Sequence, residues 1–595
     1  MSGKQTGGHD SDLKAVLADL EKASVEVIHV GIVDLDGGFR ERRFRLAEFR
    51  EFIDGGTFVN VLLQWDIADY LLLIIFLSTP VGATVEQIPM TSESACLQAQ
   101  VEIKKAMVGE VSREDFAIDP DNVDLTIFSH VVRDRMARMS VERIDTAALR
   151  SLREHEDAEF VRRRPRSREL LERSRASMPG GVPMSWMTGL YEHAPIFPVA
   201  GHGAYFEDVD GHRYLDMNQV DIAGFIGFAP APVTEALSAQ AARGSSFLLP
   251  TEDGIAVAEN LAQRVGLPFW QFTGAASNSN AEAIRLARVS TGRERVLMFE
   301  GKYHGDVEDV LGRNDGDGPK AEVPGLAANA ARGEVTIPFN DIAALEAALA
   351  GGDIACVLSE PMLTNFNLIF PDEGFWTQAQ AVIRSAGALL VIDEAHTHSF
   401  AYGGLTRAWQ LSPDVVTLGK GLGSGVPFAA YGMTQEQARV LEHHSKPPSP
   451  LESGGAAIVT GGTTYASALV LAAARATLEQ CLTPEGYARI DALGRKLAEG
   501  LEAIFAGRRL AWRAPQIGGR SGWVLGPELP RNTEESAAAM DIFFSNTRRV
   551  FMANRGIWEA LDTAGPACSF AHDEADVDLY LEVAGAFVEI TTIPA

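Results

Sequence analysis

Short apolar runs alternate with amphipathic stretches from about residue 270 to residue 435. Two of these runs, Leu389–Ile392 and Val415–Leu418, are rich in β-branched residues, as is typical of parallel strands buried on both faces. The segment EGFWTQAQAVIRSAG, which precedes the first of them, has the spacing of an amphipathic helix. This alternation predicts an α/β domain with a doubly wound, mostly parallel sheet.

Each of the two runs is followed by a charged residue, Asp393 after the first and Lys420 after the second. The carboxyl ends of parallel strands are where open α/β sheets bind ligands. A lysine beside a carboxylate suits pyridoxal phosphate, which needs an amine for a Schiff base and an acid at its ring nitrogen. A structural Asp–Lys ion pair explains the same spacing, so both interpretations stay open.

A candidate phosphate site lies in the segment WQFTGAASNSNAEAIRLAR. Its small-residue turn, Gly274 to Ser277, precedes a helix that is expected to place Ile284, Leu286 and Ala287 inward. The unpaired N–H groups at a helix start bind anions without help from lysine. Ser277 as a plain N-cap is equally compatible with the pattern. Further on, Tyr303 suits stacking on a flat heterocycle or simple packing.

The first hundred residues have a different pattern. Val25 to Gly38 alternates as a strand, ends in an Asp-Gly-Gly turn and is followed by a return strand, Phe39 to Leu46, which predicts a hairpin. The apolar run Leu71 to Leu77 is too short to span a membrane and is expected to be a core strand or helix. Residues 101–178 contain good helix formers with a break at Pro165, and their mixed charge suits a solvated connector.

Composition narrows the function classes. The chain has 595 residues, 46% of them hydrophobic and 22% charged, which indicates a globular protein of two or more domains. Its formal net charge of −28 argues against nucleic acid or an anionic membrane as a partner. The four cysteines are far apart with no metal spacing, and the N-terminus lacks a signal-peptide pattern, so we expect a cytoplasmic protein with reduced thiols and no metal site.

Residues 172–590 resemble the class III, fold type I pyridoxal-phosphate aminotransferases, in the branch near glutamate-1-semialdehyde aminomutase. The resemblance rests on eight segments in family order: PGGV, DVDGHRYLD, AIRLAR, FEGKYHG, SEP, VIDEAHT, TLGKGLGSGVPFAAYG and GGTTYASAL. It implies pyridoxal phosphate as cofactor, with a small-molecule amino donor and a carbonyl acceptor as substrates.

The resemblance also implies roles for single residues. Lys420 matches the Schiff-base lysine, which also moves a proton on the substrate, and Asp393 matches the acid that holds the ring nitrogen protonated. The remaining matches are Ala276 and Ser277 at the phosphate, Tyr303 and Ala395 on the two ring faces, His396 near the phenolic oxygen, and Thr463 reaching the phosphate from a second subunit. The last match implies a homodimer with a shared active site.

Departures from the family pattern shape the expected reaction. The usual S-G-T-E-A of the phosphate site is Ala275 to Ser279 here, so its glutamate is absent. The aminomutase element Ser-Pro-Val-Arg is replaced by Pro183 to Met187, and the glutamate near its gate is missing from LDTAGPA. We therefore favour transfer between two molecules over an aminomutase or a racemase. Arg520 is a weak candidate for the substrate carboxylate, and an exposed turn arginine is the more common case.

The N-terminal segment resembles the β-grasp domain of glutamine synthetases, through Asp34, Leu35, Asp36, Gly37, Arg40, Arg43, Phe44, Trp65, Asp66 and Asp69. We find no ligase catalytic domain after it, so an accessory role is expected, with a ligase-like or binding protein as the alternative. The expected organisation is an extra α+β domain over residues 1–100, a helical connector over 101–178, the cofactor-binding domain over 179–475 and a smaller C-terminal α/β lobe over 476–595.

Overall fold

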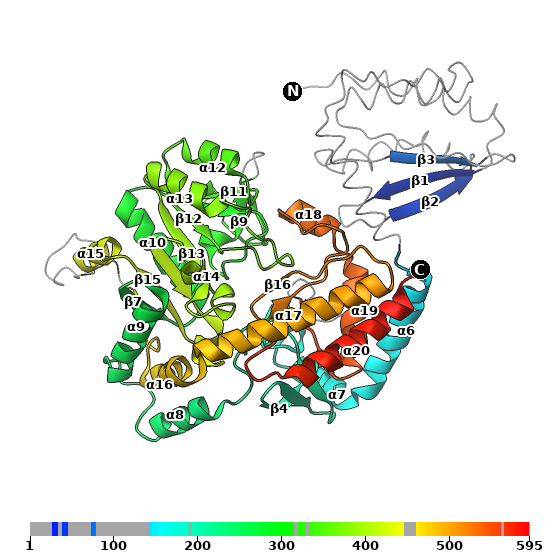
Figure 1. Cartoon of the computed structure of the whole chain (residues 1–595), viewed down its shortest axis with the longest axis horizontal. Helices are drawn as coiled ribbons and strands as arrows, with labels where there is room; N and C mark the ends of the chain where they lie inside the picture. The colour runs from blue at the N-terminus through cyan, green and yellow to red at the C-terminus, as the bar shows by residue number, and fades with distance from the viewer. Residues whose placement is uncertain are drawn as a thin grey trace, which may run out of the picture. The chain divides into compact units, whose positions relative to one another are not determined.

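The structure is a computed structural model that describes residues 27–33, 39–45, 73–78, 143–189, 193–314, 319–327, 332–445, 458, 460–560 and 565–593. The chain divides into two compact units, Met1–Phe128 and Ser129–Ala595 (Figure 1). Among the described helices, none is long and apolar enough to cross a membrane.

The first unit contains a three-stranded antiparallel sheet of β1 (Val27–Val33), β2 (Phe39–Arg45) and β3 (Leu73–Ser78), in the order β2-β1-β3. Val27 pairs with Arg45 and Val33 with Phe39, so the predicted hairpin is confirmed. The turn of this hairpin and the residues Trp65, Asp66 and Asp69 of the glutamine synthetase resemblance lie outside the described residues.

The second unit is built on a seven-stranded sheet in the order β11-β8-β12-β13-β14-β15-β7. Its strands are β7 (Phe269–Thr273), β8 (Arg295–Phe299), β11 (Glu334–Ile337), β12 (Ile354–Ser359), β13 (Leu389–Asp393), β14 (Val415–Leu418) and β15 (Ala429–Met433). In this sheet β15 runs opposite to the other six strands, which all point in one direction. The predicted mostly parallel sheet is therefore confirmed, and β13 and β14, the two predicted strands, lie next to each other.

Helices cover both faces of this sheet (Figure 1). Leu390 and Ile392 point to one apolar cluster, and Val391 between them points to the other. The first cluster is covered by α9 (Glu252–Val265), α12 (Ile342–Leu349), α13 (Phe375–Ser385) and α16 (Ala468–Ala476), and the second by α10 (Ala276–Thr291) and α15 (Gln435–His444). Burial of both faces explains why these strands are continuous apolar runs.

A second core lies among α6 (Thr146–Arg163), α17 (Pro484–Gly507), α19 (Ile542–Ala553) and α20 (Glu574–Thr591), with Leu497, Phe544 and Phe587 at its centre. A four-stranded sheet flanks it, made of β4 (Pro198–His202), β5 (Tyr205–Asp208), β6 (Arg213–Asp216) and β18 (Ile557–Trp558). The remaining elements are α7 (Pro165–Ser174), α8 (Ala231–Ala241), α14 (Gly404–Ala408), α18 (Thr533–Ala538), β9 (Gly312–Asn314), β10 (Pro319–Ala321), β16 (Gln516–Ile517), β17 (Arg520–Ser521), a π-helical turn (Thr477–Cys481) and short 3₁₀ turns. Because β18 pairs with β6, the C-terminal lobe includes chain from before the large sheet.

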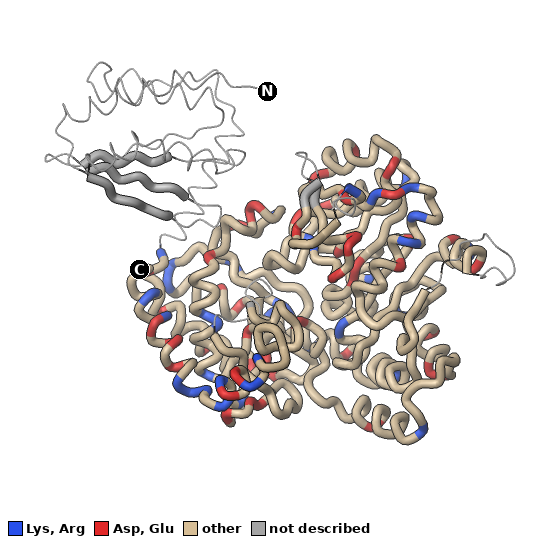
Figure 2. The backbone as a smooth tube through the Cα atoms, turned by 180° about the vertical axis from the view of Figure 1, so that it is seen from behind, with Lys and Arg blue, Asp and Glu red and all other residues tan. Residues whose placement is uncertain are grey.

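The described part of the predicted connector packs onto this lobe. Helix α6 ends at Arg163 and α7 begins at Pro165, which confirms the predicted break. Between them, Arg164 is buried and donates hydrogen bonds to Tyr214 Oη at 3.0 Å and Asn554 Oδ1 at 3.0 Å. The mixed charge of these helices (Figure 2) suggested a solvated connector, whereas partners distant in sequence bury part of it.

Candidate active site

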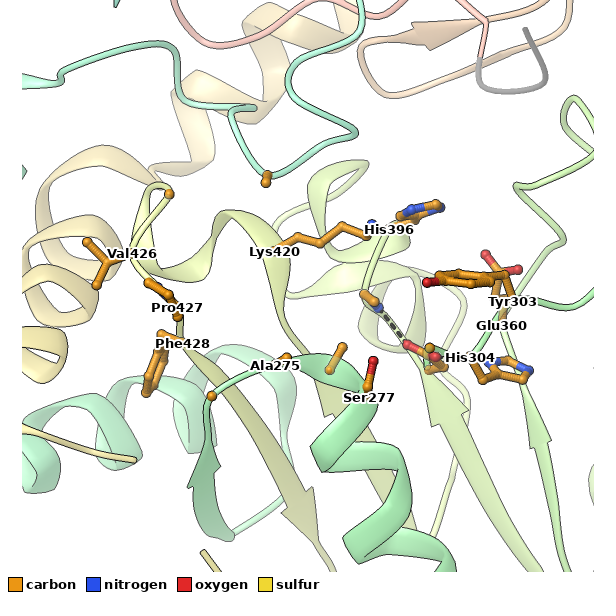
Figure 3. Close-up of a pocket in the computed structure, with 17 residues that line it drawn as sticks. Ala275, Ser277, Tyr303, His304, Glu360, His396, Lys420, Val426, Pro427 and Phe428 are labelled. Carbon is orange, nitrogen blue, oxygen red and sulfur yellow. Dashed lines mark hydrogen bonds and ion pairs between the residues drawn. The ribbon is translucent and has the colours of Figure 1, made fainter. Parts of the chain in front are cut away.

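A cavity of about 300 Å³ opens at the carboxyl ends of β13 and β14, beside the first turn of α10 (Figure 3). Sequence-predicted residues from four separate segments converge on it. Those that line it are Ala276, Ser277, Tyr303, Asp393, Ala395, His396 and Lys420.

Asp393 ends β13 and is 2% exposed. It accepts hydrogen bonds from His304 Nδ1 at 2.9 Å, Asn280 Nδ2 at 2.8 Å and the Ala395 amide at 2.9 Å. Burial by itself raises the pKa of Asp393, but these donors, His304 above all, outweigh it and hold the pKa below its usual value. The site therefore keeps a buried carboxylate that remains anionic at neutral pH.

Sequence reasoning missed the two side chains that hold this carboxylate. His304 follows β8, and its ring is as buried as the carboxylate it contacts. Asn280 lies on α10 and also accepts a hydrogen bond from Thr417 Oγ1 of β14 at 2.6 Å, so it ties the helix to both central strands. The sequence feature that could have identified them is that both are polar residues in segments predicted to border the site.

Lys420 follows β14 and points into the cavity, with a backbone φ of 50°. Its Nζ donates a hydrogen bond to Asp221 Oδ2 at 2.6 Å, a contact that the sequence did not predict. Burial raises the pKa of Asp221, but the Lys420 ammonium and the His396 ring outweigh it and bring the pKa far below its usual value. An ion pair of carboxylate and amine thus exists at Lys420, although its acid is Asp221 and not Asp393.

Asp221 is carried by a left-handed turn. Four successive residues, Gln219 to Ile222, have φ between 52° and 69°. None is glycine, and each such residue costs roughly 1–2 kcal/mol. The turn is held by Asp216, which accepts hydrogen bonds from the amides of Asn218, Gln219 and Val220 at 2.9 to 3.2 Å. Burial raises the pKa of Asp216 to about 6 against the effect of these bonds.

A chain of polar side chains continues from Asp221 across the cavity wall. His396 Nε2 lies 3.7 Å from Asp221 Oδ1, and His396 Nδ1 lies 2.5 Å from Thr364 Oγ1. The Thr364 hydroxyl donates in turn to Glu360. Burial, together with the nearby Lys420, lowers the pKa of His396, and burial raises the pKa of Glu360 to about 8. Glu360 is therefore a protonated carboxyl group at neutral pH.

The start of α10 has the features of an anion site. Its N-cap residue is Ala275, and no side chain caps the turn. Ser277 lies within the first turn of the helix, and its hydroxyl accepts a hydrogen bond from the Asp306 amide at 3.1 Å. Gly305 has a φ of +104°, and a Cβ there would come within 2.2 Å of Ser277 Oγ. Of the two interpretations of Ser277, the plain N-cap is therefore wrong.

Tyr303 and Ala395 line the cavity, as expected for the two faces of a bound ring. Tyr303 is 53% exposed. The Ala395 side chain adds only a methyl group, while its amide donates to Asp393.

Arg520 lies on β17 and is 1% exposed, so the expectation of an exposed turn arginine is wrong. Its Nη2 donates to the Thr364 carbonyl at 2.7 Å. Burial lowers the pKa of Arg520 to about 10, and the charge of the Asp221 carboxylate partly offsets this effect. The pairing of β16 with β17 turns the guanidinium inward, which local sequence does not reveal.

Thr463 does not line the cavity of Lys420. It lies in a second, more open hollow with Leu248, Trp270 and Tyr465. The neighbouring residues Phe247, Leu248 and Leu249 are 51%, 77% and 70% exposed, which is unusual for three large apolar side chains in succession.

None of the cysteines that the structure describes, Cys356, Cys481 and Cys568, lines this cavity. Burial raises the pKa of Cys356 and of Cys568 to about 12, so both stay protonated and unreactive. Over the described ranges, no group of three or more His, Cys, Asp or Glu residues is placed to hold a metal ion.

Comparison with known proteins gives a consistent result. The sequence model of the family described as Aminotransferase class-III matches residues 188–549. The chain is 32% identical over 425 residues to the glutamate-1-semialdehyde 2,1-aminomutase of Sorangium cellulosum, a match that covers 70% of this chain and 94% of that protein.

Solved structures agree. The crystal structure of a glutamate-1-semialdehyde-aminomutase from Pseudomonas aeruginosa superposes with a TM-score of 0.71 and 32% identity, covering 75% of this chain and 99% of that one. A second structure of that aminomutase, in complex with PMP, superposes with the same TM-score. An omega-transaminase from Sphaerobacter thermophilus superposes with a TM-score of 0.66 and 26% identity, covering 72% of this chain and 99% of that one.

Proposed function

The chain belongs to the class-III aminotransferase family, and from this premise we propose that it transfers an amino group from an amino donor to a separate keto or aldehyde acceptor. The observation that carries the proposal is the convergence of Lys420, Asp393 and the uncapped start of α10 on one cavity. Pyridoxal phosphate is the cofactor of this chemistry. When bound, it supplies a carbon that bonds amines and a ring that takes up electrons from the substrate.

The residues present fit this cofactor. The buried Asp393 carboxylate suits a protonated ring nitrogen, and its lowered pKa keeps it anionic there. The uncapped amides of α10, with the Ser277 hydroxyl, suit a phosphate. Gly305 leaves no room for a side chain beside Ser277, so the backbone comes close to this position.

We assign Lys420 as the residue that holds the cofactor covalently and, once an amine has replaced it, moves a proton at Nζ between the substrate and the cofactor. Asp393 orients the ring, and His304 and Asn280 orient Asp393. The other assigned contacts are Ala276 and Ser277 to the phosphate, Tyr303 and Ala395 to the ring faces, and His396 to the phenolic side of the ring. The Lys420 side chain is 20% exposed, so its surroundings limit the access of water to Nζ.

An intramolecular aminomutase is the second candidate, favoured by the similarity to the Sorangium cellulosum enzyme. Against it stands the replacement of the aminomutase Ser-Pro-Val-Arg element by Pro183–Met187, where Met184 and Trp186 are 47% and 54% exposed. A mutase must retain its intermediate between two half-reactions, and this chain lacks the aminomutase residues at that element.

We further propose that the active unit is a homodimer. Thr463 is assigned to the phosphate, but in its own chain it lies in a hollow apart from the Lys420 cavity. The exposed apolar run Phe247–Leu249 borders that hollow and gives a second copy an apolar surface to cover. Leu248→Asp is expected to yield monomers that bind the cofactor more weakly, as measured by light scattering and cofactor titration.

For residues 1 to about 100 we propose an accessory domain similar to the glutamine synthetase β-grasp, joined through residues 101–178 to the domains at 179–475 and 476–595. The three-stranded antiparallel sheet of β1 to β3 is compatible with this proposal. Loss of ATP-dependent amide formation, with unchanged amino transfer, on deletion of residues 1–100 would favour a ligase-like protein instead.

The test of the main proposal is the visible absorbance of the purified protein, followed by product analysis. A cofactor band that an amine bleaches and a keto acid restores is expected, and Lys420→Ala is expected to abolish the cycle. Isomerisation of an amino compound without any added keto acid would refute transfer between two molecules and establish the mutase.

A further inference from the structure

Lys420, which lines the cavity, forms an ion pair with Asp221. Lys420 Nζ lies 2.6 Å from Asp221 Oδ2, and the two side chains are 20% and 33% exposed. Neither the predicted role of Lys420 nor that of Asp393 requires this second carboxylate. The contact joins residues 199 positions apart in sequence, so it comes from the fold and not from a local turn.

In this contact, Lys420 Nζ carries no covalent bond to a cofactor. Lys420 has that state at two points of the proposed function: before the cofactor is bonded, and after an incoming amine has displaced it. In the displacement, the bond between Lys420 Nζ and the cofactor carbon breaks and a bond from the incoming nitrogen to that carbon forms. Two hydrogens of the incoming nitrogen end on Nζ, so the exchange balances without any further reactant.

We propose that Asp221 is the docking position of the displaced Lys420: it binds the released Nζ and thereby favours the exchange in which an amine takes the place of the lysine. This inference rests on the proposed function. Asp221 acts through Lys420 and is a positioning residue.

Charge balance around Asp221 supports this role. When Lys420 is bonded to the cofactor, its hydrogen bond to Asp221 is lost, but the carboxylate still has His396 Nε2 at 3.7 Å and the buried guanidinium of Arg520 in its field. These two groups therefore stay beside Asp221 when Lys420 is bonded elsewhere. The other ionisable groups that face this pair are Glu360, Asp393 and Tyr303.

The backbone also indicates a functional position. Four successive non-glycine residues in the left-handed region cost free energy, and such strain persists only where the surroundings enforce it. The enforcing group is the buried Asp216, whose carboxylate accepts from three consecutive amides of the turn. A strained turn with its own buried carboxylate support places Asp221 opposite the reactive amine.

The test uses the full-length protein and Asp221→Asn, because asparagine tolerates a left-handed backbone. Asp221→Gly is the second variant, because glycine relieves the strain of the turn while removing the carboxylate. The first readout is the rate at which methoxyamine bleaches the cofactor band. The second is the affinity of the cofactor-free protein for pyridoxal phosphate.

The proposal predicts opposite effects on the two readouts. Displacement by methoxyamine is expected to slow by about tenfold in both variants, because the leaving lysine has lost a charged hydrogen-bond partner. Cofactor affinity is expected to rise, because the free lysine is no longer held by Asp221. A variant that is weaker in both readouts would show a merely structural role and overturn the proposal.

Two controls separate the alternatives. Asp309→Asn removes an ion pair of similar length and exposure, Arg288 to Asp309 at 2.7 Å, away from the cavity, and is expected to change neither readout. Slower displacement by 2-(aminooxy)ethylamine alone, which carries a second ammonium group, would show that Asp221 binds a substrate cation and would overturn lysine docking. A wild-type protein that methoxyamine does not bleach would refute the proposed function itself.

A cycle with Lys420→Ala isolates the pair. In that background, Asp221→Asn is expected to leave the affinity for pyridoxamine phosphate unchanged, because the proposed contact is to the lysine. A loss of affinity there would place Asp221 on the cofactor and overturn the proposal.

Discussion

Replacing His304 by phenylalanine removes one of the three donors that hold Asp393. An aromatic ring of somewhat larger volume takes the place of the imidazole, while the hydrogen bond from Nδ1 at 2.9 Å is lost in a place where both side chains are almost fully buried. Asn280 and the Ala395 amide remain as donors, so the carboxylate keeps part of its support.

The size of the effect follows from this geometry. A hydrogen bond to a charged group contributes about 1.5–3 kcal/mol, which corresponds to a loss of cofactor affinity of about ten- to a hundredfold. The pKa of Asp393 is held below 3.8 mainly by His304 against burial, so it rises in the variant. The Asp393 carboxylate is the form that suits the cofactor, so the fall in cofactor affinity on acidification is expected to begin at a higher pH in His304→Phe. A lowered pKa gives stability that is present above the unfolded pKa and lost as the pH falls through the folded pKa, so the stability that Asp393 contributes becomes smaller in the variant as its folded pKa rises.

The assay is fluorescence titration of the cofactor-free protein with pyridoxal phosphate, repeated from neutral towards acid pH. The matched control is His212→Phe, which removes a similar His–Asp contact, 3.1 Å from His212 Nδ1 to Asp208 Oδ2, outside the cavity. Wild-type affinity and an unshifted acid limb in His304→Phe would refute the role given to this histidine.

Three further predictions concern the walls of the site. Burial raises the pKa of Glu360 from 4.5 to about 8. The stability that the protonated Glu360 contributes is therefore complete below pH 4.5 and is lost as the pH rises through 8. Glu360→Gln is expected to flatten this fall in stability, measured as the thermal denaturation midpoint against pH. Asp216→Ala removes the acceptor of three amides and is expected to cost about 2–3 kcal/mol locally, measured as faster proteolysis of the following turn, and unchanged cleavage would contradict it. Gly305→Ala is expected to weaken cofactor binding at least tenfold, because the added Cβ would come within 2.2 Å of Ser277 Oγ. Gly211→Ala is the control for backbone strain alone, because Gly211 also has a positive φ but has open space around the position of a Cβ.

The residues missed from sequence share one property, which is that their role depends on a partner far along the chain. Asp221 belongs to a turn with no motif, and its partner Lys420 is 199 residues away. Arg520 is a different case, because the sequence names it as a candidate; it sits beside glycines in a segment typical of an exposed turn, whereas the structure buries it. From the sequence, His304 is an ordinary loop residue. In the structure, its ring lies beside Asp393 at the end of β13.

The sequence by itself determined the α/β class, the parallel order of the central strands, the aminotransferase family and the positions of Asp393 and Lys420. The fold class, the strands and the charged residues at their ends follow from local periodicity, since a strand buried on both faces has to be continuously apolar and its polar residues have to lie at its ends. The family follows from a resemblance that eight segments in family order carry. Only the tertiary structure decided which carboxylate meets the lysine, because hydrogen bonds depend on distances of a few ångströms between segments whose separation no local pattern records. In the structure Asp221 binds Lys420, whereas Asp393 accepts hydrogen bonds from His304 and Asn280.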